Sequence, residues 1–242
     1  MLVLPERTEI TRGDRRMRSA LSIDVSKAAL LCVDLQEEHR SDSRYLVEGY
    51  DRVLDNVRHL QGVARKAGPP VLHVAYVIDP SRPVRAFHPL TPDGRSAFSD
   101  VGDPLSELCG EVGPAGAETV LVKDDSSAFS RMEFETALRQ RRIDTLFVTG
   151  VWTEACIAAT VGDALARGFR VVLVKDACGS GSRAMHETAV LNLANRLYGG
   201  AVTDTEGACR LMAGETVAAW QVRDPVPLRF TYENAACLYG EL

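Results

Sequence analysis

The stretch AALLCVD, residues 28–34, decides the fold. Six apolar residues in a row are closed by one acidic residue, Asp34, which is the pattern of a strand buried on both faces. Strands of this kind belong to parallel sheets that carry helices on either side. The stretch therefore predicts a buried strand of a parallel sheet, with Asp34 at its carboxyl end.

The segments that follow alternate between strand and helix patterns. Residues 46–67 space apolar side chains at helical intervals and stop at Gly68-Pro69-Pro70, which predicts a helix with a defined end. Further strands are expected at 71–77, 119–122, 145–150, 170–175 and 201–203, and helices at 132–142, 154–167, 183–197 and after the last strand. This alternation predicts a Rossmann-like, three-layer αβα domain whose six-stranded, mainly parallel sheet has right-handed crossovers.

The 242 residues suffice for one large domain, expected at 26–213. A polar arm, 1–25, precedes it. The extension at 214–242 is too apolar for free solution, so it should pack on its own domain or lie across a second subunit as an arm. The Pro- and Gly-rich stretch 79–116 exceeds an ordinary connection and is expected to cover the functional site.

Composition excludes several classes of protein. With 28 basic against 33 acidic residues the formal charge is −5, so there is no broad positive field for binding nucleic acid. The longest uncharged stretch, 67–78, is too short to span a membrane. The arginines of the arm are mixed with acids and no apolar run follows them, so the arm is not expected to be a signal peptide. Six cysteines without a C-x-x-C pair fit reduced thiols in a cytoplasmic protein.

Three residues with chemical potential follow predicted strands. Asp34 ends the first strand, Lys123 the third, and Cys156 lies near the start of the helix after the fourth. Ligands of an open parallel sheet bind outside the carboxyl ends of its strands, so an acid, a cation and a thiol are expected at one rim. This set suits acyl transfer. The ammonium and the helix N-terminus would lower the pKa of the thiol, and the carboxylate would take its proton.

The local motifs sharpen this interpretation. They are DLQEEH at 34–39, KDDSSAF at 123–129, GVWTEACIAAT at 150–160 and DAC at 176–178. In this order they resemble the motifs of the isochorismatase-like cysteine hydrolases, and the resemblance covers roughly residues 26–213. It implies a catalytic triad of Asp34, Lys123 and Cys156. It also implies a cis peptide bond at Val151–Trp152 and an oxyanion hole formed by the backbone amides of Trp152 and Cys156.

The resemblance also implies a substrate pocket. Gln36 and Phe129 match family positions that border it. Two residues depart from the family pattern: His39 stands where a Phe is usual, and Trp152 where the residue is usually small. Both are expected to line the pocket and to change its shape, so the predicted substrate-binding residues are Gln36, His39, Phe129 and Trp152.

The same comparison of motifs narrows the chemistry. Nicotinamidases of this superfamily hold a metal through an Asp-x-His pair after the first strand, and this sequence has no such pair between Asp34 and His73. We therefore expect no metal and no cofactor, and nicotinamide is disfavoured as a substrate. A nucleophilic cysteine favours cleavage of carbon–nitrogen bonds, as in the amidohydrolase branch, with a small amide, carbamoyl or ureido compound as substrate.

Two other functions stay open at the level of sequence. If His39 and Trp152 fill the pocket, the fold would serve binding or assembly without turnover. If Cys156 and Cys178 form a reversible disulfide, the protein would be a thiol redox sensor. Because members of the superfamily form dimers and tetramers, a homodimer or homotetramer is expected, with neither nucleic acid nor membrane as a partner.

Overall fold

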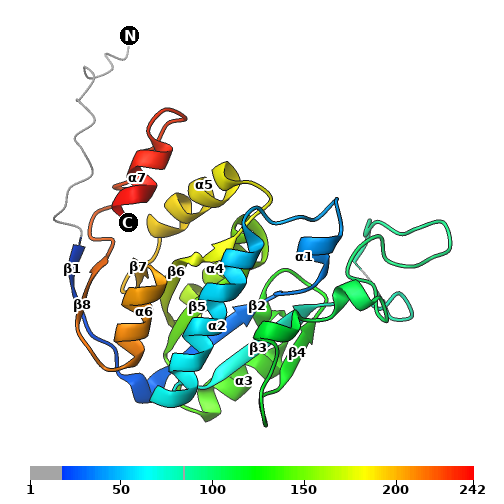
Figure 1. Ribbon diagram of the computed structural model, residues 1–242, viewed down its shortest axis with the longest axis horizontal. Helices are drawn as coiled ribbons and strands as arrows, with labels where there is room; N and C mark the ends of the chain where they lie inside the picture. Colours follow the sequence, from blue (N-terminus) through cyan, green and yellow to red (C-terminus); the bar gives the residue numbers. More distant parts are fainter. Residues whose placement is uncertain (1–17, 84) are drawn as a thin grey trace.

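The computed structural model describes residues 18–83 and 85–242. Within them, eight strands form one sheet in the order β1-β8-β7-β6-β5-β2-β3-β4, with helices on both faces (Figure 1). The strands are β1 (Arg18–Leu21), β2 (Ala28–Val33), β3 (Val71–Tyr76), β4 (Val120–Lys123), β5 (Thr145–Val151), β6 (Arg170–Gly179), β7 (Ala201–Thr203) and β8 (Val217–Trp220). The α-helices are α1 (Glu38–Ser41), α2 (Tyr50–Ala67), α3 (Met132–Gln140), α4 (Ala158–Ala166), α5 (Arg183–Ala194), α6 (Thr205–Met212) and α7 (Ala235–Glu241). Short 3₁₀ turns are η2 (Val25–Lys27), η3 (Pro104–Ser106), η4 (Gly110–Val112) and η5 (Ala128–Ser130), and η6 (Thr153–Ile157) is a π-helical turn.

The sheet has two strands more than the six predicted. Strand β1 pairs antiparallel with β8, in the register Arg18↔Trp220, and β8 joins the parallel strands through an antiparallel contact with β7. Both strands are four residues long and contain alanines, so they carry a weak strand pattern. The sheet therefore extends beyond 26–213 at both ends. Of the expected arm, residues 1–17 lie outside the described residues, and 18–21 belong to the sheet.

Strand β2 behaves as its sequence predicts. All six residues are buried, and the strand runs parallel to β3 on one side and to β5 on the other. Leu30 faces Val71 of β3 and Phe147 of β5 across these ladders. Because β2 is flanked by strands and covered by helices, its carboxyl end at Asp34 lies near the middle of the sheet's rim.

One glycine fixes the approach of β5 to β2 at this rim. Gly150 has φ +117°, and a Cβ atom there would lie 2.0 Å from the backbone oxygen of Val33. Only glycine tolerates both the backbone conformation and the close approach. The contact positions the turn after β5, which carries Trp152 and Cys156.

The long stretch 79–116 is fixed to the rim by polar side chains of the segment after β2. The buried carboxylate of Glu38 accepts hydrogen bonds from the backbone N–H of Ser99 at 3.0 Å and from its hydroxyl at 2.5 Å. The amide of Gln36 donates to the backbone oxygens of Tyr76 and Ser106 at 2.9 and 2.8 Å. The stretch is thus held against the carboxyl ends of β2 and β3.

The C-terminal extension packs on its own domain, one of the two predicted alternatives. Figure 1 shows α7 above α5. The side chains of Leu228, Leu238 and Leu242 are buried in the main apolar cluster. Asn195 of the segment after α5 accepts from Leu228 N and donates to Leu228 O, both at 2.9 Å. The extension therefore completes one face of the core.

Candidate active site

The three residues predicted to form the catalytic triad lie together. Lys123 Nζ is 2.8 Å from Asp34 Oδ2 and 3.4 Å from Cys156 Sγ. Asp34 directly follows β2, Lys123 ends β4, and Cys156 lies in η6 after β5. The first two side chains are buried, whereas Cys156 is partly exposed. The topology thus places an acid, a cation and a thiol in contact at the rim.

The electrostatics differ from the sequence-based expectation. Burial raises the pKa of the Cys156 thiol, and the negative charge of Asp34 raises it further, against the smaller opposing effect of Lys123. The expected lowering of this pKa was wrong, because the buried carboxylate competes with the thiolate for the one ammonium. Burial likewise raises the pKa of Asp34, while Lys123 opposes the shift. The raised pKa keeps Cys156 in its thiol form in the resting cluster.

Asp34 is arranged to accept a proton. Its Oδ2 is taken by Lys123, but its Oδ1 is buried without a hydrogen-bond partner among residues 18–83 and 85–242. A buried oxygen left without a donor is costly, so this atom is poised to accept a proton or a donor group. The raised pKa of Asp34 likewise favours uptake of a proton by this carboxylate.

Cys156 sits in an unusual turn between β5 and α4. The peptide bond Val151–Trp152 is cis, as the resemblance implied. The backbone oxygen of Trp152 then accepts from Ala155 N at 3.0 Å and from Ile157 N at 3.2 Å, which closes the π-helical turn. π-Helical turns are frequent at functional sites. The assignment of the Trp152 and Cys156 amides to an oxyanion hole stays a prediction.

The two departures from the family pattern touch each other. The indole Nε1 of Trp152 donates to His39 Nδ1 at 3.2 Å, and the rings meet edge-on with centroids 6.2 Å apart. Burial lowers the pKa of His39 to about 4, although hydrogen bonds to the backbone of Tyr45 and Asp34 oppose the shift. His39 is therefore neutral near pH 7. The pair forms one wall beside the catalytic cluster.

Gln36 and Phe129 are not placed to bind substrate. The Gln36 side chain is fully buried, and both of its amide atoms are engaged, with Tyr76 N donating to Oε1 at 3.0 Å. Phe129 is buried in the core, edge-on to Phe134 and tilted against Phe169. Their predicted role is therefore corrected to a structural one. A motif fixes the position of a residue along the chain but does not show which way its side chain points.

Tyr76 is a site residue that the sequence analysis missed. Lys123 Nζ lies 4.8 Å from the centre of the Tyr76 ring. The same ring stacks on the ring of Phe98 with an interplanar angle of 17°. Burial raises the pKa of its phenol to about 12, and the nearby thiol of Cys156 contributes. Tyr76 ends β3 at the same rim as Asp34 and Lys123, which is the signal that could have identified it. Phe98 belongs to the stretch 79–116, so that stretch does border the site.

A small cavity opens beside this rim. Its volume is about 120 Å³. It is lined by Ile78, Pro83, Arg85, His88, Asp124 and Asp125. Asp124 and Asp125 directly follow Lys123, and Ile78 lies two residues after Tyr76, so the cavity adjoins the catalytic cluster. There is room in it for part of a small molecule.

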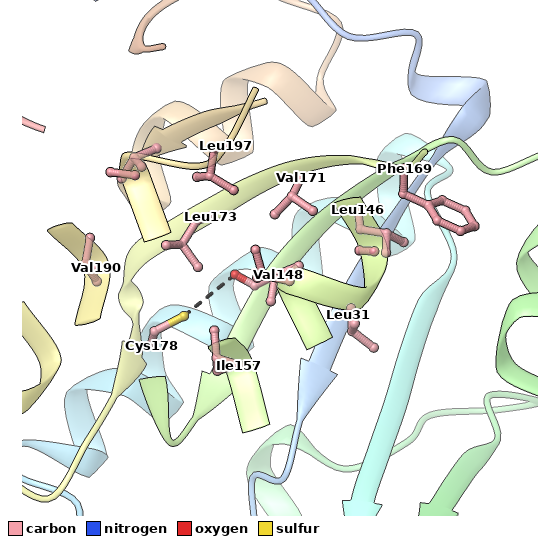
Figure 2. Packing of buried hydrophobic residues seen from close by; sticks show 14 of the residues in the cluster. Leu31, Leu146, Val148, Ile157, Phe169, Val171, Leu173, Cys178, Val190 and Leu197 are labelled. Atoms are coloured by element: carbon pink, nitrogen blue, oxygen red, sulfur yellow. Dashed lines mark hydrogen bonds between the residues drawn. The ribbon is translucent and has the colours of Figure 1, made fainter. Parts of the chain in front are cut away.

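The DAC motif lies inside β6. Cys178 is buried, and its Sγ donates to the backbone oxygen of Val148 at 3.7 Å among apolar side chains that include Ile157 and Val190 (Figure 2). Burial raises the pKa of this thiol. Asp176 accepts two hydrogen bonds from Thr205, at 2.7 and 2.9 Å. The environment of Cys178 is that of a core residue, which favours a hydrolase over a redox sensor.

Residues 18–83 and 85–242 contain neither a cluster of potential metal ligands nor a helix suited to crossing a membrane. No three or more side chains of His, Cys, Asp and Glu are grouped so that they could hold a metal ion. No helix in this part of the chain has the length and apolarity needed to cross a membrane.

Comparisons with known proteins agree with the geometry. The sequence profile of the isochorismatase domain matches residues 28–207. Maleamate amidohydrolase of Pseudomonas putida is 29% identical over 199 residues, which cover 78% of this chain and 89% of that protein. N-carbamoylsarcosine amidase of an Arthrobacter species is 30% identical over 145 residues, covering 54% of this chain and 51% of that one. A crystal structure of an isochorismatase family protein from Desulfovibrio vulgaris superposes with a TM-score of 0.70 at 29% identity, covering 77% of this chain and 98% of that chain.

Proposed function

This chain belongs to the isochorismatase family, and from that premise we propose that it is a metal-independent cysteine hydrolase of non-peptide carbon–nitrogen bonds. The observation that carries the proposal is the contact of Lys123 Nζ with both Asp34 and Cys156. The names of the two enzymes described above point to amide and carbamoyl compounds. We therefore infer a small amide, carbamoyl or ureido compound as the substrate.

The first half of the reaction forms a thioester. Asp34 takes the proton of Cys156 as the sulfur attacks the substrate carbonyl carbon, and backbone N–H groups of Trp152 and Cys156 receive the negative charge that moves onto oxygen. Asp34 then gives the proton to the leaving nitrogen. The carbon–nitrogen bond breaks, ammonia or an amine departs, and the acyl group stays on Cys156.

The second half regenerates the enzyme. A water molecule gives a proton to Asp34 and attacks the thioester carbon, and the carbon–sulfur bond breaks. The departing thiolate recovers the proton from Asp34. Lys123 stays charged throughout, so the site always holds one cation and one anion while the negative charge moves between oxygen and sulfur. This constancy matters because an unbalanced charge in a buried site is costly.

Replacement of Cys156 tests the proposal. Cys156→Ala and Cys156→Ser are expected to release no ammonia from a panel of small primary amides and ureido compounds that the unmodified enzyme cleaves. The matched control is Cys237→Ser, because Cys237 is an exposed cysteine on α7 outside the site. Rapid-quench intact mass spectrometry of the unmodified enzyme should show an acyl adduct on Cys156. Full turnover by Cys156→Ala would rule out the mechanism.

A further inference from the structure

A second, much larger cavity lies next to the catalytic cluster. Its volume is about 1300 Å³, and it lies between the start of α2, the end of β6 and the start of α5. Its walls carry charged side chains of both signs, among them Arg52, Lys175 and Asp176. Among the described residues, the lining of this cavity does not include Asp34, Lys123 or Cys156.

The side chain of Trp152 contacts the lining of this cavity, and its backbone leads into the turn that carries Cys156. A Cβ atom on Gly181 would lie 2.7 Å from Cζ3 of the indole and 2.9 Å from its Cη2, so the ring rests directly on the backbone of Gly181. The indole N–H is bonded to His39. Gly181 and His39 both line the cavity, whereas Trp152 directly precedes the turn η6 that carries Cys156.

The indole is held firmly in this position. Its N–H is a donor only, so the bond at 3.2 Å requires an unprotonated Nδ1 on His39. The pKa of His39, about 4, keeps the ring neutral near pH 7, and the bond from the indole selects the tautomer with its proton on Nε2, in which Nδ1 does not donate to the backbone oxygen of Tyr45 3.3 Å away. The imidazole is itself packed edge-on against the ring of Tyr50, with centroids 5.9 Å apart. The wall therefore consists of two rings that support each other, backed by a residue without a side chain.

We propose that Trp152 sets the size limit for substrates of the proposed hydrolase by closing Cys156 off from the large cavity. The inference rests on the proposed function. Compounds with a small acyl group reach Cys156, whereas amides whose acyl group would extend toward Gly181 are excluded. Without the indole the two spaces join, and the charged walls of the cavity would accept an acyl group with a polar extension.

Alkylation of Cys156 tests the wall without any need for turnover. The probes are iodoacetamide and fluorescein maleimide, each reacted with the full-length protein and read out at Cys156 by peptide mass spectrometry. In Trp152→Ala the rate of the bulky probe relative to the small one is expected to rise at least tenfold. Trp152→Phe is the matched control, because it keeps a ring against Gly181, and its ratio should stay within about threefold of the original protein. An unchanged ratio in a folded Trp152→Ala protein overturns the proposal.

A second variant, Gly181→Ala, displaces the indole without changing Trp152 itself. Gly181→Ala places a methyl group where the indole ring lies, so the ring must move, and the relative rate of the bulky probe should rise here too. In the double variant with Trp152→Ala, Gly181→Ala should add nothing, since its effect acts through the indole. An equal effect of Gly181→Ala with and without Trp152 contradicts the proposal. Gly181→Ala by itself keeps the test decisive if Trp152→Ala does not fold: an unchanged ratio of probe rates in folded Gly181→Ala then overturns the proposal.

Measurements of turnover distinguish a failure of this inference from a failure of the proposed function. With homologous amides of increasing acyl length, Trp152→Ala should raise kcat/KM for long polar substrates relative to short ones by tenfold or more. If no amide is cleaved by either protein while the labelling ratio changes as expected, the hydrolase proposal fails and the wall stands. If the unmodified enzyme cleaves short amides but neither ratio responds to Trp152→Ala, the wall fails and the hydrolase proposal stands.

Discussion

Asp34 governs both the proton and the charge of Cys156. Burial raises the pKa of the thiol, and the carboxylate of Asp34, which contacts the same ammonium that would stabilise a thiolate, raises it further. In the proposed mechanism the cysteine is therefore activated by transfer of its proton to Asp34 when substrate binds, and is not held as a standing thiolate. A site of this kind protects its nucleophile from adventitious alkylation and oxidation, which require the thiolate.

Asp34→Asn should separate these two effects. Removal of the negative charge leaves Lys123 facing the thiol alone, so the pKa of Cys156 falls and its alkylation by iodoacetamide at pH 8 is expected to speed up by about tenfold per unit of pKa. Turnover is lost, because Asn accepts no proton. The pH profile of Cys156 alkylation in both proteins measures the shift. In the original protein the midpoint should lie above the free-thiol value of about 8.5, and a midpoint below it would contradict this account.

At the scale of elements, the segment after β2 fastens the long stretch 79–116 over the site. Glu38 is the principal anchor, since its buried carboxylate takes both the N–H and the hydroxyl of Ser99. Ser99 itself has φ +49°, a conformation that side chains other than glycine seldom adopt. Next to it, Phe98 stacks on Tyr76. The anchor thus holds an aromatic wall beside Lys123.

Glu38→Ala should loosen this stretch while the sheet stays folded. Loss of two hydrogen bonds to a buried carboxylate costs about 2–5 kcal/mol locally, so trypsin is expected to cleave after Arg85 or Arg95 at least tenfold faster. Limited proteolysis with mass spectrometry locates the cuts, and circular dichroism checks the fold. Asp55→Ala serves as the control, because Asp55 makes an exposed ion pair with Arg58 within α2. Equal cleavage of both variants would refute the role of Glu38.

The sequence predicted well those helices and strands whose residue pattern can be recognised within the segment itself. Strand β2 is one apolar run and α2 ends at a glycine, so both could be identified without knowledge of their partners. Strands β1 and β8 could not, because their sequence patterns are weak and the two segments pair with each other from opposite ends of the chain, with β8 also contacting β7. In the site, strand ends predicted the positions of Asp34 and Lys123. The direction of the Gln36 side chain and the pKa of Cys156 depend on burial, which the motifs do not report.

At the scale of the whole molecule, the buried His39 and the half-buried His186 link stability to pH. Burial lowers the pKa of His39 and of His186 from 6.5 to about 4. His186 lies between Thr153 Oγ1 at 2.8 Å and the hydroxyl of Tyr239 at 3.1 Å, so it connects α7 to the turn that follows Trp152. Each histidine is neutral in the folded protein at a pH where the unfolded chain would bind a proton.

The free energy of unfolding should therefore fall as the pH is lowered from 6.5 to 4. In this window the unfolded chain binds more protons than the folded one, and each histidine contributes a loss of up to about 3 kcal/mol. The raised pKa of Asp34 and Glu38 acts in the opposite direction, so the difference between proteins is the informative quantity. Urea denaturation at several pH values should give a flatter profile for His186→Gln than for the original protein. Parallel profiles would show that His186 is already protonated when folded.

The pairing of β1 with β8 has a consequence for synthesis. Ser19 and Gln221 are 202 residues apart, yet the amide of Gln221 donates to the hydroxyl and the backbone oxygen of Ser19 across this edge of the sheet. A ribosome releases the chain from its N-terminus, so β1 leaves the exit tunnel long before β8, with which it pairs in the described part of the chain, has been translated. Until then it is an unpaired strand in a crowded cell, and the sheet edge closes last. The nascent chain must therefore carry that segment unprotected for most of its translation.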